Sequence, residues 1–147
     1  MKKVYSILFF LLFHTTSVIA QIKYSDSLNM MFGYACGIGG YPQPYMLRTV
    51  KLVNNSEKDK LYAMLVSENP QDQIYGYVGL YFYKSNGNKL SKNETQQMKT
   101  VQQSERIVTY CRGCFFGLKA PLKDLLRKKR LKSYYRWYVI TGYNKYQ

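Results

Sequence analysis

The placement of three cysteines constrains the fold of this chain most. Cys111 and Cys114 enclose Arg112 and Gly113 in one short motif, while Cys36 stands about 75 residues earlier. In an oxidising compartment three cysteines most economically form one disulfide and one free thiol, and the sequence does not choose among the three pairings. A bond from Cys36 to either later cysteine would close a long loop and stabilise the fold by roughly 4 to 5 kcal/mol.

The first twenty residues indicate that the chain reaches such a compartment. Two lysines precede a largely apolar run from Val4 to Phe13, and the residues Val18 to Ala20 fit a signal-peptide cleavage site. We therefore predict a signal peptide over residues 1–20 and a single small exported domain over residues 21–147. The apolar run is shorter than the roughly 20 residues that a membrane span needs, so we expect a soluble periplasmic or secreted product.

Loss of this segment would limit the chemistry of the mature chain. The 22 Lys and Arg outnumber the 8 Asp and Glu, and only Lys2 and Lys3 would leave, so the product would stay strongly basic. The only histidine, His14, would also leave, which removes the usual general base and the imidazole ligand of metal sites. We predict no catalytic residue, no metal and no cofactor. The expected partner is an acidic protein or an anionic surface, and nucleic acid is not expected.

Helical spacing and capping residues dominate the middle of the chain. Apolar residues repeat at helical intervals over residues 46–53, and side chains suited to capping a helix start follow at Ser56, Asn69 and Ser91. Glu94 completes a capping box with Ser91. The expected fold is mainly α, built from helical hairpins.

Residues 74–83 are ambiguous between a helix and a strand. Their β-branched and aromatic side chains favour a strand, and Gly76 and Gly79 weaken a helix. The cap at Asn69 and the stop signal at Asn86-Gly87 favour a helix. The capping signals decide the assignment, and we expect a helix.

A minor β element is expected near the C-terminus. Residues 106–111 and 134–141 are rich in β-branched and aromatic side chains, and we predict that they pair. Between them Pro121 would begin a helix with three leucines on one face and basic side chains around it.

These basic side chains support one of three functional hypotheses, the binding of an anionic polymer or membrane surface. The anion-binding candidates are Lys123, Arg127, Lys128, Lys129, Arg130, Lys132 and Arg136. A second hypothesis is a thiol–disulfide redox protein that uses Cys111 and Cys114, because a neighbouring cation such as Arg112 favours the reactive thiolate. The leading hypothesis is a non-enzymatic exported interaction or structural domain that a disulfide stabilises.

Two short motifs resemble those of small exported bacterial proteins of no established function. They are Tyr34-Ala35-Cys36-Gly37 and Cys111-Arg112-Gly113-Cys114, and the resemblance covers about residues 32–117. The middle of the chain is also similar to a degenerate pair of HEAT-like helices. These resemblances imply a helical interaction module and carry over no catalytic residue. We further infer that Gly113, which lacks a side chain, allows close packing beside the cysteines.

Overall fold

The computed structural model describes residues 31–34, 36–37, 40 and 42–141. By its contacts the chain divides into the units Met1–Met30 and Met31–Gln147. The predicted signal peptide lies outside the described residues. Within them helices predominate, and a two-stranded antiparallel sheet lies near the C-terminal end, which confirms the expected fold class. None of the helices in this part of the chain combines the length and apolarity that crossing a bilayer requires.

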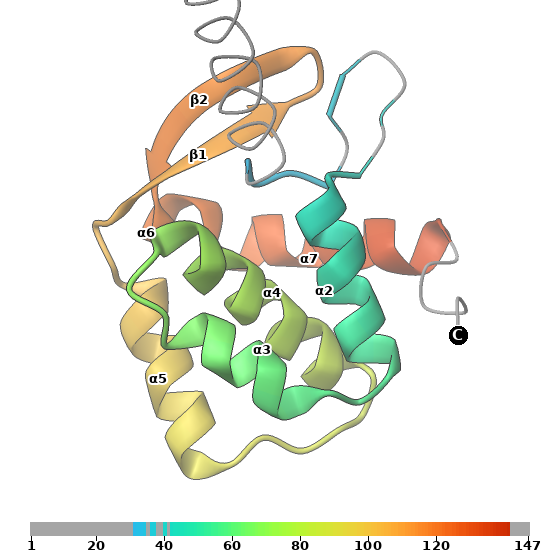
Figure 1. The fold of residues 1–147 in the computed structure, drawn as a ribbon, viewed down its shortest axis with the longest axis vertical. Coiled ribbons are helices and arrows are strands. Elements are labelled where there is room, and N and C mark those ends of the chain that lie inside the picture. Colours follow the sequence, from blue (N-terminus) through green and yellow to red (C-terminus); the bar gives the residue numbers. More distant parts are fainter. Residues whose placement is uncertain (1–30, 35, 38–39, 41, 142–147) are drawn as a thin grey trace, which may run out of the picture. The chain divides into compact units, whose positions relative to one another are not determined.

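Helix α4, Pro70–Ser85, is the centre of the fold and confirms the helix expected over residues 74–83. The Asn69 side chain accepts a hydrogen bond from the Gln71 amide at 2.9 Å, as a cap does. Every residue from Gln73 to Leu80 is buried, so this stretch is enclosed on all sides. Its neighbours are α2 (Pro44–Asn54), α3 (Lys58–Leu65), α5 (Lys92–Gln102), α7 (Lys128–Ile140) and strand β1 (Ile107–Arg112) (Figure 1).

The two glycines of α4 allow α3 to pack very closely against it. A Cβ at Gly76 would overlap the Leu65 amide nitrogen and would lie 2.8 Å from the Leu61 carbonyl oxygen. A Cβ at Gly79 would lie 2.9 Å from the Thr49 methyl carbon of α2. These glycines weaken an isolated helix, but here they let neighbouring elements approach the α4 backbone.

The link between α2 and α3 differs from the prediction. Ser56 has a φ of 57°, and its amide donates to the Val53 carbonyl at 3.1 Å. The Glu57 amide donates to the Leu52 carbonyl at 2.9 Å. This pair of bonds is a Schellman motif, so Ser56 ends α2 instead of capping the next helix. The predicted Ser56 cap is wrong, and α3 begins at Lys58.

Helix α5 begins with the predicted capping box. The Ser91 hydroxyl accepts from the Glu94 amide at 3.1 Å, and the Glu94 carboxylate accepts from the Ser91 amide at 2.6 Å. Glu94 also pairs with Lys58 at 3.0 Å, which links α5 to α3. Burial raises the pKa of Glu94, but the hydrogen bonds from Ser91 and Lys58 outweigh burial and leave that pKa below its ordinary value.

The sheet has a different second strand from the predicted one. Strand β1 confirms the extended segment at residues 106–111, but it pairs antiparallel with β2, Phe115–Pro121, and not with residues 134–141. Only Gly113 and Cys114 separate the two strands, and the φ of 56° at Gly113 suits a tight two-residue turn. Closing this short loop costs less entropy than pairing with a more distant segment.

Residues 134–140 belong to helix α7 and not to a strand. Leu131, Tyr134 and Tyr138 recur at helical spacing, and all three side chains are buried. The aromatic content of this segment favoured a strand, but burial of one helical face overrides that preference because strand propensity depends on packing context.

Helix α6, Leu122–Leu125, is only one turn long instead of the longer helix predicted from Pro121. The predicted apolar face is confirmed, because all three leucines of this segment are fully buried. Helix α6 ends before Arg127, and α7 begins at Lys128. The basic residues that follow therefore lie on α7.

The segment before α2 runs along the other edge of β1. We call its described residues between positions 31 and 37 the N-terminal arm. Phe32 exchanges two backbone hydrogen bonds with β1, both at 2.9 Å, in a parallel bridge. Cys36 forms a second parallel bridge with Gly113. The Tyr75 hydroxyl of α4 donates to the Met31 carbonyl at 2.6 Å, so the arm is also attached to the central helix.

Candidate functional site

Cys36 of the N-terminal arm forms a disulfide with Cys111 of β1. Their Cα atoms are 5.8 Å apart, and both residues are buried. This bond selects one of the three pairings that the sequence left open and supports a disulfide-stabilised domain. The redox hypothesis needs Cys111 to pair with Cys114, whereas in the structure Cys114 lies exposed in the hairpin turn with a free thiol.

The disulfide packs directly against the backbone of the arm at Gly33. A Cβ at Gly33 would overlap both bonded sulfur atoms. Apart from its two chain neighbours, no heavy atom of the described residues lies within 4 Å of the Cβ position of Gly113, so its missing side chain is not what allows packing beside the cysteines and that inference is wrong. The structure requires Gly113 for its positive φ and Gly33 for its missing side chain.

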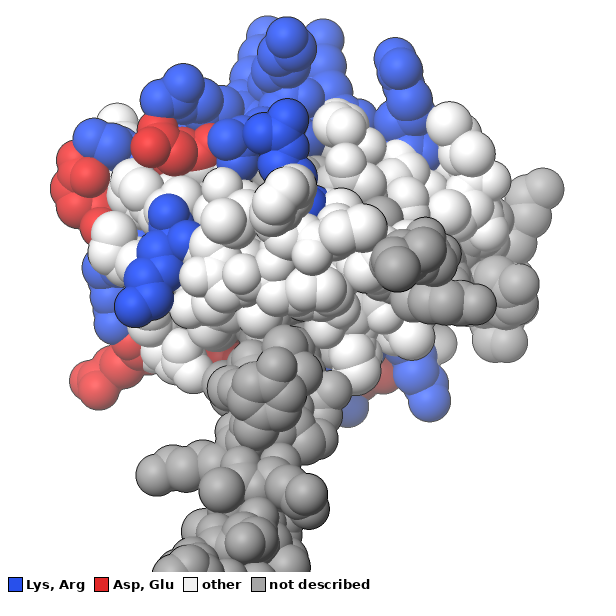
Figure 2. Space-filling model, turned by 90° about the horizontal axis from the view of Figure 1, so that it is seen from above, with Lys and Arg blue, Asp and Glu red and all other residues white. Residues whose placement is uncertain are grey.

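The seven predicted anion-binding residues divide into two groups. Lys123 and Arg127 form ion pairs with Glu105 and Asp124 respectively. The other five lie on α7 and have no ion pair within the described part of the chain: Lys128, Lys129, Arg130, Lys132 and Arg136. All of these except the half-buried Arg130 are exposed. In Figure 2, Lys and Arg side chains gather along the upper edge of the molecule with few acidic side chains among them.

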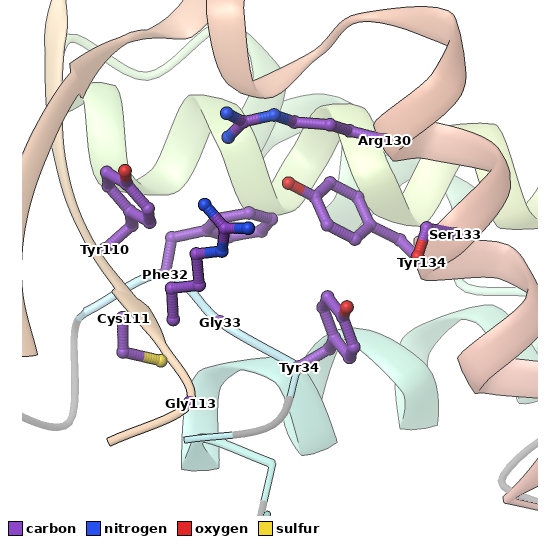
Figure 3. Close-up of a pocket in the computed structure, with 10 residues that line it drawn as sticks. Phe32, Gly33, Tyr34, Tyr110, Cys111, Gly113, Arg130, Ser133 and Tyr134 are labelled. Atoms are coloured by element: carbon purple, nitrogen blue, oxygen red, sulfur yellow. The ribbon is translucent and has the colours of Figure 1, made fainter. Parts of the chain in front are cut away.

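A pocket of about 240 Å³ lies beside the disulfide, where the N-terminal arm, β1 and α7 meet. Arg112 from β1 and Arg130 from α7 line it, and among the described residues no acidic side chain does so. Phe32, Tyr34, Tyr110 and Tyr134 supply aromatic walls. Figure 3 shows Arg130 reaching from α7 across the pocket towards the β1 side. The pocket therefore combines two positive charges with aromatic surfaces.

The aromatic side of the pocket is held by contacts among rings. Tyr34 lies with its ring centroid 5.2 Å from that of Tyr134 and 5.6 Å from that of Trp137. The Phe32 and Tyr134 rings meet edge to face at 5.4 Å. The Tyr134 hydroxyl donates to the Leu125 carbonyl at 3.3 Å. Because these contacts join the arm to α7, they fix the shape of the wall that a ligand would meet.

The pocket stays positively charged at neutral pH. Burial raises the pKa of Tyr134 to about 12, and the nearby guanidinium of Arg130 only partly opposes this effect. Tyr134 is therefore neutral at physiological pH and adds no negative charge to offset the two arginines. An oxyanion that enters the pocket would meet guanidinium donors, which form short charge-assisted hydrogen bonds with carboxylates, sulfates and phosphates.

The groups that line this pocket are suited to holding an anion. Among residues that the structure describes, no group of three or more His, Cys, Asp and Glu side chains could hold a metal ion. The pocket lining offers guanidinium, hydroxyl and aromatic groups, and the sulfur of Cys111 is already bonded to Cys36. These groups can position an anion.

Sequence reasoning found Arg130 but not its counterpart Arg112. On a helix, Arg130, Ser133 and Tyr134 share one face, and all three line the pocket. The strand wrongly assigned to residues 134–141 concealed this grouping. Arg112 comes from β1, and no spacing in the sequence places it opposite α7.

Comparisons of the chain with protein-family models, with curated proteins and with solved structures found no match. The resemblances to small exported bacterial proteins and to HEAT-like helices stay predictions. Evidence on function comes from the geometry of the site.

Proposed function

We propose that this protein is an exported, non-enzymatic domain that binds an acidic polysaccharide, with one anionic sugar residue in the pocket beside the Cys36–Cys111 disulfide. One observation carries the proposal. Arg112 and Arg130 come from different elements, line the same pocket and have no acidic partner within the described ranges. Guanidinium groups bind carboxylates, sulfates and phosphates through paired hydrogen bonds.

The shape of the pocket favours a sugar residue over a lipid surface. Its volume of about 240 Å³ lies below the roughly 300 to 1,000 Å³ of sites for drug-sized ligands and therefore suits a single ring-sized group. The aromatic walls can pack against the less polar face of that ring. A membrane presents a broad surface, whereas this site is a concavity formed by three segments. A discrete anionic group on a ring is the better match.

The exposed cations of α7 favour a polymer over an isolated sugar. Lys129 and Arg136 lie four residues before and three residues after Ser133 of the pocket lining, so they flank the pocket on the same side of α7, and both are exposed. A chain with repeated negative charges can contact these cations while one of its residues occupies the pocket. Much of this attraction acts between exposed charges, so salt should weaken it strongly.

Calorimetric titration with polygalacturonate at increasing salt concentration tests the proposal. We expect binding at low salt that weakens by at least about tenfold near 0.5 M salt, where the Debye length falls to a few ångströms. The neutral polymer dextran should not bind. Binding that is absent at low salt or insensitive to salt would contradict the proposal.

Variants locate the binding site. Arg112→Gln combined with Arg130→Gln should lower the affinity at least about tenfold, because two charge-assisted contacts are lost. Lys51→Gln combined with Lys89→Gln removes the same charge from exposed positions outside the pocket and should change the affinity by less than about threefold. Equal losses in the two double variants would show that only net charge matters.

A further inference from the structure

A second pocket, of about 460 Å³, lies between α4, α5 and α7. Among the described residues, it shares no lining residue with the pocket that Arg112 and Arg130 line. Its apolar lining comes from the helices and from the link between α4 and α5, and consists of Tyr77, Tyr81, Leu90, Met98 and Leu131. Met98 and Leu131 are 8% and 3% exposed, so they belong to the buried side of this pocket.

Three lysines line the same pocket, one from each helix: Lys84 of α4, Lys99 of α5 and Lys128 of α7. All three are exposed, and none forms an ion pair in the part of the chain that the structure describes. No Asp or Glu of the described residues lines the pocket. The pocket is therefore apolar on its buried side and carries uncompensated positive charge on its solvent side.

We infer that this pocket binds a single-chain anionic amphiphile of the fatty-acid class. The chain would lie against Met98 and Leu131, and the anionic head group would lie among the three lysines. Charge complementarity selects this ligand, because a cationic head would be repelled and a neutral head would leave the lysines without a partner. The volume falls in the range of small-ligand sites, roughly 300 to 1,000 Å³.

Titration of the purified protein with amphiphiles below their micellar concentrations tests this inference. We expect saturable binding of dodecanoate with one ligand per chain. Decanoate, which is shorter by two methylene groups, should bind about 16-fold more weakly, because each buried methylene contributes roughly a fourfold change in affinity. The cationic counterpart dodecyltrimethylammonium should bind at least about tenfold more weakly than dodecanoate.

A matched pair of triple variants identifies the site. Changing Lys84, Lys99 and Lys128 to Gln should lower the affinity for dodecanoate at least about tenfold. Changing Lys51, Lys89 and Lys92 to Gln removes the same charge from exposed positions outside the pocket and should leave the affinity within about threefold. Circular dichroism should show equal helical content in both variants, since all six positions are exposed.

Binding of the amphiphile can be tested separately from the proposed binding of a polysaccharide. The double variant Arg112→Gln/Arg130→Gln should bind dodecanoate like the wild type, because neither arginine lines this pocket. Three results would overturn the inference: equal binding of the cationic amphiphile, unchanged affinity in the Lys84, Lys99 and Lys128 variant, or dodecanoate binding that accompanies loss of the helical signal. A dimer of the ligand-free protein that buries these three lysines would overturn it as well, because the occupant of the pocket would then be a second copy of the chain.

Discussion

The α3–α4 contact and the junction of arm, β1 and α7 are held together in different ways. At Gly76 the α4 backbone touches α3 with no space for a methyl group. At the junction backbone hydrogen bonds and the Cys36–Cys111 bond connect the segments, and a pocket of about 240 Å³ lies beside them. Close packing excludes a ligand, whereas a covalent link holds segments together without filling the space between them. A binding site is therefore expected at the junction.

The two regions also differ in how much of each element is buried. Helix α4 is enclosed over residues 73–80, whereas every residue of β2 is exposed or half-buried. Phe115 and Phe116 of β2 are 71% and 49% exposed. Of the two strands, only β1 contributes buried side chains, including Val108 and Cys111. The position of the hairpin thus depends on β1 and on its disulfide to the arm.

The largest effect should come from removing the disulfide. Cys36→Ala combined with Cys111→Ala should lower the free energy of unfolding by about 4 to 5 kcal/mol, because the bond spans a sequence separation of 75 residues. Urea denaturation measures this loss. Cys114→Ala should change the free energy of unfolding by less than about 0.5 kcal/mol, because its exposed thiol is unpaired. A larger loss from Cys114→Ala than from the double variant would show that the junction is not held by this bond.

A methyl group at the helix contact should have the next largest effect. Gly76→Ala should lower the free energy of unfolding by about 3 kcal/mol, since the new Cβ overlaps the backbone of Leu65 and neither helix can yield locally. Ser85→Ala, at an exposed position of α4, is the matched control and should have little effect. If Gly76→Ala were neutral in thermal and urea unfolding, the α3–α4 contact would not be tightly packed.

Gly33→Ala tests packing at the junction itself. It should lower the free energy of unfolding by about 2 kcal/mol in the oxidised protein, because its Cβ overlaps both sulfur atoms. The same substitution in the Cys36→Ala/Cys111→Ala background should cost less than about 1 kcal/mol, because the sulfur atoms are gone. Equal costs in both backgrounds would mean that Gly33 serves the backbone conformation and not the disulfide.

The smallest effect should come from Glu94, which belongs to the helical part of the comparison. Glu94→Gln should lower the free energy of unfolding by about 1 kcal/mol at pH 7 through loss of its charged hydrogen bonds to Ser91 and Lys58. The pKa of Glu94 in the folded protein is lowered, so its contribution is complete above its ordinary value of 4.5 and is lost as the pH falls through the folded-state pKa. Urea unfolding from pH 7 to pH 3 should show a smaller decline in the variant, and parallel curves would contradict this role.

Capping residues in the sequence predicted those helix starts that depend on hydrogen bonds between residues close together in the chain. Asn69 caps α4, and Ser91 with Glu94 forms the box of α5, because each bond joins residues two or three positions apart. Ser56 shows the limit of such signals. It suits a cap by its residue type, yet it ends α2 in a left-handed conformation. Residue type does not distinguish the end of one helix from the start of the next when the two are adjacent.

Long-range contacts produced the errors. The aromatic content of residues 134–141 predicts a strand, but Tyr134 and Tyr138 are buried on one face of α7. The inference of close packing at Gly113 rests on its missing side chain, whereas the glycine that lies against the disulfide in space is Gly33. In each case the deciding neighbour comes from another part of the chain.

The order of residues alone established a basic, mainly helical chain with three candidate cysteines, because charge and helical periodicity are properties of the sequence. The three-dimensional fold decided that Cys36 bonds to Cys111 and that Arg112 and Arg130 line one pocket. These pairs meet because the arm is hydrogen-bonded to β1, and both β1 and α7 pack against the central helix α4. The free energy of that packing depends on side chains from the whole domain.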